Sequence, residues 1–233
     1  MRTAVIGASR GLGLELTKAF LSRGHSVFAV CRQDPVPGEL EDLREQYGPH
    51  LLLARADVTD AGQMARAAIL VKQAWGELDA LIHAAGILAD TDRVNPLHQA
   101  DIGDLRATLD VNVVGPVIAV KTFYPLIKKG VNAPFVIVTS EGCDVASAGS
   151  WIPAYALSKC AATKIASIMN QTVPDVRFIA LHPGRIRTVM GRDTWLIEAA
   201  QSAEGIVKLI TEEQMGQMDS WYIDYRGQDM LRE

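Results

Sequence analysis

The sequence predicts a doubly wound α/β fold built on one parallel sheet of seven strands. Short apolar, β-branched runs alternate with longer amphipathic stretches along the whole chain, as in repeated βαβ units. Several of these runs are continuously apolar, such as Ala80-Leu81-Ile82, so helices should cover both faces of the sheet. The length of 233 residues suits a single domain that spans residues 1–233.

Helix-capping and turn residues support the elements expected in the first part of the chain. Gly24 follows the first helical stretch at the position of a C-terminal cap, and Asp60 with Gln63 resembles a capping box. Residues 34–38 contain two prolines and a glycine and should form a loop. In order, we expect a strand at 3–6, a helix at 12–22, a strand at 26–31, a helix at 39–47, a strand at 51–55, a helix at 61–75 and a strand at 79–84.

The second part of the chain repeats the alternation with longer helices. Gly130 is expected to close a long central helix. The elements expected here are a helix at 102–128, a strand at 135–139, a helix at 154–170, a strand at 177–181, a helix at 203–210 and a strand at 221–224.

Composition and charge argue against several classes of partner. The 23 Lys and Arg against 27 Asp and Glu give a net charge of −4, whereas nucleic acid or an anionic membrane requires clustered positive charge. The longest apolar stretch, residues 111–120, is shorter than the roughly 20 residues that span a bilayer. Three scattered cysteines without a Cys-x-x-Cys pair favour neither disulfides nor a metal site, so we expect a cytoplasmic protein without a metal.

A glycine-rich turn follows the first expected strand directly. Its spacing is Gly-x-x-x-Gly-x-Gly, and residues without a Cβ let the backbone approach a pyrophosphate that the next helix N-terminus holds. A tight turn without a ligand is the alternative reading, but the position after the first strand favours a dinucleotide and a Rossmann-type fold. The expected contacts in the turn are Gly7, Ser9, Arg10, Gly11, Leu12 and Gly13.

The end of the second strand indicates which dinucleotide binds. Arg32 ends this strand, and Arg10 lies in the glycine turn, so both can reach a ribose 2′-phosphate. Asp34 is the competing ligand for a free ribose hydroxyl, but it precedes Pro35 in a turn. We therefore expect NADP(H) in preference to NAD(H).

Tyr155 and Lys159 lie four residues apart in an Ala-rich helical stretch, so their side chains share one helix face. A phenol with its usual pKa near 10 is a poor base at neutral pH. An ammonium nearby, together with the positive charge of an oxidised nicotinamide, would lower that pKa. Tyr155 could then exchange a proton with a substrate oxygen. An ordinary helix surface is the alternative reading of the pair alone.

Together with the glycine turn, these residues resemble the short-chain dehydrogenase/reductase family over nearly the whole chain. Six motifs stand in the family's order. They are the turn Gly7 to Gly13, Asp57-Val58, Ala84-Ala85-Gly86, Asn112, Ser140 with Tyr155 and Lys159, and Pro183-Gly184 through Ile186 to Thr188.

The resemblance implies a role for each of these positions. Tyr155 would be the acid/base, Lys159 would lower its pKa and bind the nicotinamide ribose, and Ser140 would hydrogen-bond the reacting oxygen. Asn112 would hold a water that relays protons to Lys159. The implied cofactor contacts are Asp57 and Val58 at the adenine, Ala84, Ala85 and Gly86 at the adenosine ribose side, and Pro183, Gly184, Ile186 and Thr188 toward the nicotinamide carboxamide.

The chain departs from the family pattern at three places. His83 and Ala84 replace two asparagines after the fourth strand, and a buried, hydrogen-bonded His83 is the expected outcome. Ser140 lies 15 residues before Tyr155, about two more than usual, but it ends a strand and is preferred to Ser147 and Ser150. The segment after Thr188 is short for a substrate lid. This short lid, together with residues 182–191 and 219–225, resembles the C-factor-like and sniffer-like carbonyl reductase branch.

These observations predict an NADP(H)-dependent oxidoreductase that interconverts a ketone or aldehyde and an alcohol by hydride transfer. The alternatives are a cofactor-binding regulatory or signalling protein, and an isomerase or dehydratase on the same scaffold. The resemblance also implies a homodimer or homotetramer. The small-molecule substrate would meet mainly apolar walls, each of which could instead be core packing: Leu88, Cys143, Asp144, Trp151, Met190 and Trp195.

Overall fold

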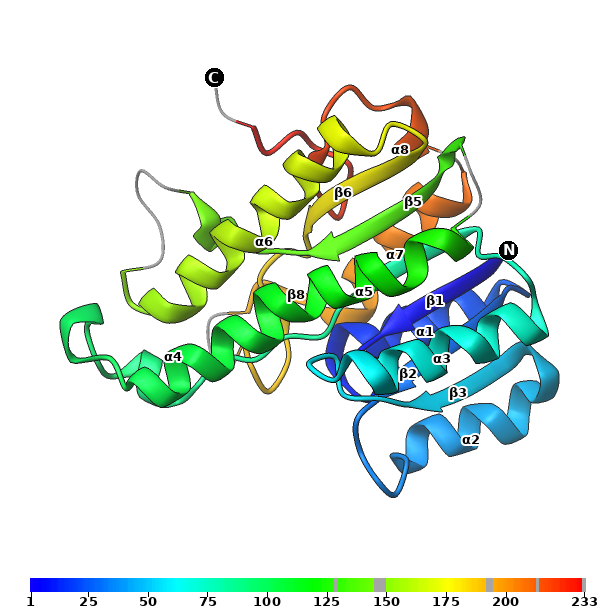
Figure 1. The fold of residues 1–233 in the computed structure, drawn as a ribbon, viewed down its shortest axis with the longest axis horizontal. Coiled ribbons are helices and arrows are strands. Elements are labelled where there is room, and N and C mark those ends of the chain that lie inside the picture. The colour runs from blue at the N-terminus through cyan, green and yellow to red at the C-terminus, as the bar shows by residue number, and fades with distance from the viewer. Residues whose placement is uncertain (128–129, 145–149, 192–194, 213, 232–233) are drawn as a thin grey trace.

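The structure is a computed structural model that describes residues 1–233 except 128–129, 145–149, 192–194, 213 and 232–233. Seven strands form one sheet in the order β3-β2-β1-β4-β5-β6-β9, and all neighbouring pairs are parallel. The sheet strands are β1 (Arg2–Ile6), β2 (Ser26–Cys31), β3 (Leu51–Arg55), β4 (Ala80–His83), β5 (Gly130–Val138), β6 (Val176–His182) and β9 (Tyr222–Asp224). The topology confirms the predicted fold class (Figure 1).

Helices cover both faces of the sheet, as the apolar strands predict. Along β1, Ala4 and Ile6 face one core while Val5 faces the other, because strand side chains alternate between faces. Helices α3 (Ala61–Ala74), α5 (Gly115–Phe123) and α6 (Pro153–Thr172) pack on the first face. Helices α1 (Gly11–Ser22), α2 (Gly38–Tyr47) and α7 (Ala199–Thr211) pack on the second.

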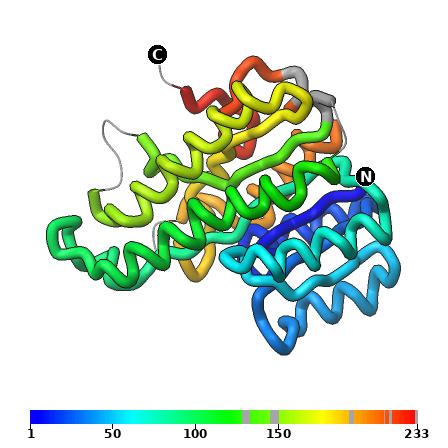
Figure 2. Tube along the Cα trace, viewed as in Figure 1, coloured from blue at the N-terminus to red at the C-terminus, as the bar shows by residue number. Residues whose placement is uncertain are grey.

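The strand order reverses between β1 and β4, which places a crevice at the carboxyl ends of these strands. The first third of the chain builds one end of the sheet and the last third builds the other (Figure 2). The remaining short elements in the second half of the chain are α4 (Ile102–Leu109), β7 (Ile186–Arg187), β8 (Ile197–Glu198) and α8 (Gln214–Gln217). Strands β7 and β8 form a separate two-stranded sheet, which the sequence did not predict.

The central helix predicted at residues 102–128 is wrong as one continuous element. Helix α4 ends at Leu109, a π-helical turn covers Asp110–Val114, and α5 ends at Phe123 before a 3₁₀ turn. Prolines explain both breaks, because Pro116 and Pro125 lack the N–H that an α-helix uses to bond the carbonyl four residues earlier. Gly130 opens β5 and is not a helix cap, while residue 128 lies outside the described residues.

The two other punctuation signals are confirmed. Gly24 follows the end of α1 with a φ of 76°, and its N–H donates to the Leu21 carbonyl at 2.9 Å. The Asp60 carboxylate accepts from the Gln63 N–H at 2.9 Å and caps α3. Within the described residues, no helix is both long and apolar enough to cross a membrane.

Candidate active site

The glycine turn between β1 and α1 brings bare backbone to the crevice. Gly7 has a φ of 89°, and a Cβ there would lie 2.6 Å from the Ala85 nitrogen. A Cβ on Gly13 would lie 2.1 Å from the Gly7 carbonyl oxygen. No side chain caps α1, whose N-cap residue is Arg10, so the N–H groups of its first turn remain available to an anion.

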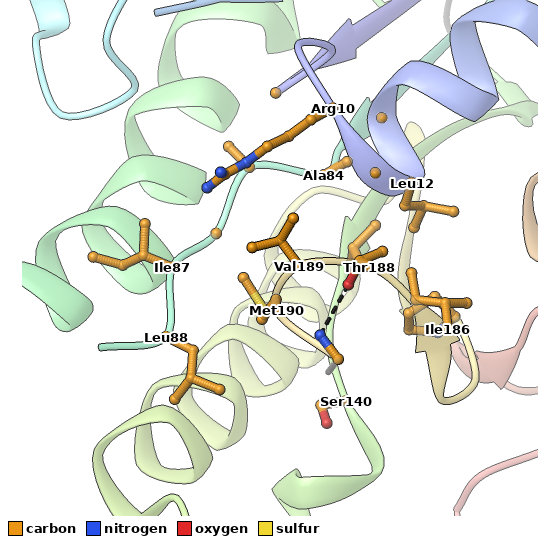
Figure 3. A pocket seen from close by; sticks show the side chains of 18 of the residues that line it. Arg10, Leu12, Ala84, Ile87, Leu88, Ser140, Ile186, Thr188, Val189 and Met190 are labelled. Carbon is orange, nitrogen blue, oxygen red and sulfur yellow. Dashed lines mark hydrogen bonds between the residues drawn. The ribbon is translucent and has the colours of Figure 1, made fainter. Parts of the chain in front are cut away.

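A cavity of about 1150 Å³ extends from this turn to Ser140 (Figure 3), and Tyr155 also lines it. Its volume exceeds the roughly 300–1,000 Å³ of common small-molecule pockets. All residues predicted to contact the cofactor line it: Gly7, Ser9, Arg10, Gly11, Leu12, Gly13, Arg32, Asp57, Val58, Ala84, Ala85, Gly86, Tyr155, Lys159, Pro183, Gly184, Ile186 and Thr188.

Of the two charged residues expected to select the dinucleotide, Arg32 lines the cavity and Asp34 does not. Arg32 is exposed at the cavity wall, and its Nη1 lies 3.7 Å from Asp57 Oδ2. Asp34 instead forms a salt bridge with Arg55 and does not line the cavity. Arg10 extends from the glycine turn into the cavity (Figure 3) and forms no ion pair within the described part of the chain.

Tyr155 and Lys159 project from the first turns of α6, and Ser140 stands just after β5. Lys159 Nζ lies 5.5 Å from the centre of the Tyr155 ring, so the predicted shared helix face is present. Ser140 Oγ accepts the Gly142 N–H at 3.1 Å, and the Ser140 hydroxyl is close enough to the Tyr155 phenol to favour a lower pKa of that phenol. Of the competing serines, Ser150 lines the cavity and Ser147 lies outside the described residues.

Burial controls the acidity of this pair. Lys159 is almost fully buried, and its Nζ donates to the Val138 carbonyl at 2.8 Å. Burial lowers the pKa of Lys159 to about 8. Burial also raises the pKa of Tyr155 to about 12, although the Arg93 charge and the Ser140 hydrogen bond oppose that rise. In the chain alone, therefore, the expected lowering of the tyrosine pKa by Lys159 is not found.

Asn112 lies behind the cavity wall, within the π-helical turn. Its Oδ1 accepts the Ile87 N–H at 2.8 Å, while its Nδ2 donates to the Ile87 carbonyl at 2.8 Å and to Ser158 Oγ at 2.9 Å. A Cβ on Gly86 would lie 3.3 Å from Asn112 Oδ1 and 3.4 Å from Lys159 Nζ. The amide therefore fixes the segment after β4 to α6 beside the lysine, and its water-holding role stays a prediction.

Sequence reasoning missed Asp92, which fixes the start of α6. Its buried carboxylate accepts the N–H of Ala154 at 2.8 Å and of Tyr155 at 2.9 Å. A carboxylate at this position satisfies free amide groups and matches the positive end of the helix dipole. The only local signal is that Ile152, the N-cap residue, offers no polar side chain.

The expected substrate walls divide into two groups. Leu88, Asp144, Trp151 and Met190 line the cavity. Cys143 and Trp195 are not among the residues that line it. Cys143 turns its buried thiol to the Tyr222 hydroxyl at 3.0 Å, which directs it into the core. Trp195 is 41% exposed and lies 5.1 Å beneath the Arg187 guanidinium.

His83 ends β4 and is buried as expected, but it is not hydrogen-bonded through Nε2 to any described residue. Burial, assisted by the nearby Lys159 charge, lowers the pKa of His83 to about 3. The imidazole is therefore neutral at physiological pH and adds no second positive charge behind Lys159.

A glycine turn at the switch point of a parallel sheet, sharing one cavity with serine, tyrosine and lysine side chains, is typical of dinucleotide-binding α/β folds. The family model described as short chain dehydrogenase matches residues 2–198. The chain therefore belongs to the short-chain dehydrogenase/reductase family.

Curated relatives with named activities are similar over about four fifths of the chain. Benzil reductase ((S)-benzoin forming) IRC24 of Saccharomyces cerevisiae is 29% identical over 195 residues, which are 81% of this chain and 73% of that protein. Oxidoreductase BOA17 of Botryotinia fuckeliana is 30% identical over 79% of this chain. The chain spans 65% of the length of BOA17 and 41% of the length of the Aspergillus terreus short chain dehydrogenase tazN.

Solved structures share the whole fold. A carbonyl reductase from Pseudomonas aeruginosa PAO1 in complex with NADP is 26% identical, with a TM-score of 0.85 and 98% of each chain covered. Carbonyl reductase Sniffer of D. melanogaster is 24% identical, with a TM-score of 0.85 and 97% of each chain covered. The predicted family is thus confirmed, with carbonyl reductases among the relatives that this chain resembles.

We predict that Lys159→Met stabilises the protein without cofactor at pH 7, because it removes a charge that burial disfavours. Lowering a pKa from 10.5 to about 8 corresponds to a gain of at most about 3 kcal/mol, less the lost bond to the Val138 carbonyl. The wild-type unfolded chain holds more protons than the native state between these two pKa values, so wild-type stability rises with pH there. The advantage of the variant should therefore shrink toward pH 10.

Urea unfolding of the wild type and the variant at pH 7 and pH 10 measures this effect. Lys164→Met is the matched control, because Lys164 is exposed on the same helix. Equal shifts for the two variants, or a gain that grows with pH, would contradict the prediction.

Proposed function

We propose that this protein is an NADP(H)-dependent oxidoreductase that interconverts a ketone or aldehyde and an alcohol by hydride transfer. The observation that carries the proposal is the clustering of Ser140, Tyr155 and Lys159 at one end of the cavity that the glycine turn opens. The fold alone would fit many reactions, whereas this cluster supplies donors and a proton at one point.

The residues present fit an NADP(H) molecule. A Cβ on Gly7 would clash with the Ala85 backbone and one on Gly13 with the Gly7 carbonyl, so this tight turn requires glycine at both positions, and the uncapped start of α1 offers N–H donors to a diphosphate. Arg10 and Arg32 would hold the 2′-phosphate, since guanidinium groups bind phosphate through paired, charge-assisted bonds. Lys159 would bind the nicotinamide ribose.

When bound, NADPH supplies a hydride to the carbonyl carbon of the substrate. Ser140 and Tyr155 would hydrogen-bond the carbonyl oxygen, because the Gly142 N–H occupies a lone pair of Ser140 Oγ and leaves the serine proton to donate. A tyrosine pKa near 12 keeps the phenol protonated at neutral pH, so Tyr155 can give its proton to that oxygen. The Lys159 ammonium would stabilise the phenolate left behind.

The cluster also bears on the two alternative functions. A regulatory or signalling protein would need only to bind the cofactor and would not need a proton donor. The serine, tyrosine and lysine side chains lie close together here, which favours an enzyme. An isomerase or dehydratase would form product with no net change in cofactor absorbance. Continuous measurement of NADPH absorbance with a panel of carbonyl compounds separates these functions from net reduction.

Tyr155→Phe should lower kcat by at least about 100-fold and leave the Kd for NADPH within about twofold, because it removes only the transferable proton. Stopped-flow NADPH oxidation and fluorescence titration measure the two quantities. Tyr47→Phe is the matched control, since Tyr47 ends α2 outside the cavity lining. Wild-type turnover in Tyr155→Phe would exclude Tyr155 as the acid/base.

The wild type should bind NADPH more tightly than NADH, and Arg10→Ala and Arg32→Ala should each weaken NADPH binding by about 10- to 100-fold, as expected for a lost charged hydrogen bond. NADH affinity should change by less than about threefold. Titration calorimetry checks this, with Arg44→Ala on α2 as a control outside the cavity. Tighter wild-type binding of NADH would overturn the cofactor assignment.

We also propose that the chain forms a homodimer or homotetramer through α4, α5 and α6. Large apolar side chains on these helices are about half exposed, as expected for a surface that a second copy covers. They are Ile102, Val117, Leu157 and Ile168. Val117→Asp should shift the sedimentation coefficient toward that of a monomer, and a monomeric wild type would contradict the proposal.

A further inference from the structure

The cavity is lined by five arginines, which differ in whether an acid pairs with them. Arg32 pairs with Asp57 at 3.7 Å, Arg185 with Glu141 at 2.5 Å, and Arg187 with Glu198 at 3.3 Å. Arg10 and Arg93 form no ion pair within the described ranges. The proposed cofactor phosphate accounts for Arg10 and leaves Arg93 at the other end of the cavity.

Arg93 has only neutral partners among the described residues. Its Nη2 donates to the Met190 carbonyl, which belongs to the segment that covers the cavity. Its Nε is buried without a hydrogen-bond partner. Its Nη1 makes no hydrogen bond with a described residue and is accessible. Because Arg93 lines the cavity, this nitrogen is available to a ligand there.

The loop around Arg93 is held against the catalytic helix. The carboxylate of the preceding residue, Asp92, accepts the N–H groups of Ala154 and Tyr155 and forms no ion pair with Arg93. The Arg93 charge reaches Tyr155, because it opposes the burial that raises the pKa of that phenol. Arg93 is therefore close to the reacting end of the cavity and not to the adenosine end.

Met190, whose carbonyl binds Arg93, lines the cavity together with the apolar side chains of Leu88 and Trp151, and Asp144 lines it as well. An unpaired guanidinium in such a setting is costly unless a ligand supplies the opposite charge. A carboxylate matches guanidinium geometry and forms strong, charge-assisted hydrogen bonds with it.

We propose that Arg93 binds a carboxylate of the substrate, so that this enzyme prefers aldehydes or ketones that also carry an ionised carboxyl group. The inference rests on the proposed carbonyl reduction. Arg93 would hold the carboxylate through Nη1 while Ser140 and Tyr155 hold the carbonyl oxygen, and these two contacts fix which carbon faces the hydride donor. The bond from Nη2 to Met190 would keep the guanidinium oriented before the substrate arrives.

A matched pair of aldehydes tests this specificity. The wild type should show a kcat/KM for 4-formylbenzoate about 10- to 100-fold above that for methyl 4-formylbenzoate, the range expected for a charged hydrogen bond. Arg93→Gln, which removes the charge and keeps a polar side chain, should remove this preference and change kcat/KM for the ester by less than about threefold. Arg93→Lys should restore part of it, because a lysine keeps the charge but not the fork of donors.

A binding measurement separates this proposal from the proposed function. Titration calorimetry of benzoate into the NADP⁺-saturated wild type should show binding that Arg93→Gln weakens at least about 10-fold. Arg106→Gln, an exposed position on α4 outside the cavity, should behave as wild type. Unchanged NADPH affinity and unchanged thermal unfolding in Arg93→Gln show that the variant folds normally.

The outcomes are distinct. Arg93-dependent benzoate binding without reduction of either aldehyde would overturn the proposed function and support the carboxylate site. Equal loss of turnover on acid and ester would show that Arg93 only latches the covering segment to the loop, which overturns the inference. Failure of benzoate to bind the wild type, or equal binding to Arg93→Gln, would overturn it as well.

Discussion

The buried ammonium of Lys159 is the constraint on which the rest of the site depends. Its hydrogen bond among the described residues goes to one neutral carbonyl, that of Val138, and burial lowers its pKa to about 8. A charge in such a place is tolerated only where the surroundings hold it in one position. The end of β5 and the first turns of α6 must therefore keep their relative position, and Gly86 must leave room, because a Cβ there would lie 3.4 Å from Lys159 Nζ.

Two long-range contacts keep that register. Asn112 joins the segment directly after β4 to α6 through Ile87 and Ser158. Asp92 joins the loop that follows to the first turn of the same helix. Both contacts come from the segment between β4 and α5. The π-helical turn that interrupts this segment is thus more than a local irregularity, because it carries the asparagine to the position where its amide meets both partners.

The sequence predicted those features that arise from local chemistry. The apolar runs, the glycine turn and the caps at Gly24 and Asp60 each depend on residues within a few positions of one another. The clustering of the expected cofactor residues around one cavity was predictable because the carboxyl ends of parallel strands converge at one edge. Asp92 was not, since it caps a helix that begins some 60 residues later. The orientation of Cys143 likewise depends on packing and hydrogen bonding that periodicity does not report. The break near Pro116 has a local cause, the missing N–H, but the apolar periodicity alone runs through it.

Charge illustrates the same limit at the level of the whole molecule. A net charge of −4 gives no indication of a positively charged cavity, and acids line it as well: Glu15, Asp57, Glu141, Asp144 and Glu198. What decides the local field is which charges are paired, because a pair a few ångströms apart has little effect at a distance. Asp57, Glu141 and Glu198 each face an arginine, so much of the cavity is balanced. The field that remains comes largely from Arg10 near the glycine turn and from Lys159 and Arg93 near the reacting end, where anions would be bound and a phenolate would form.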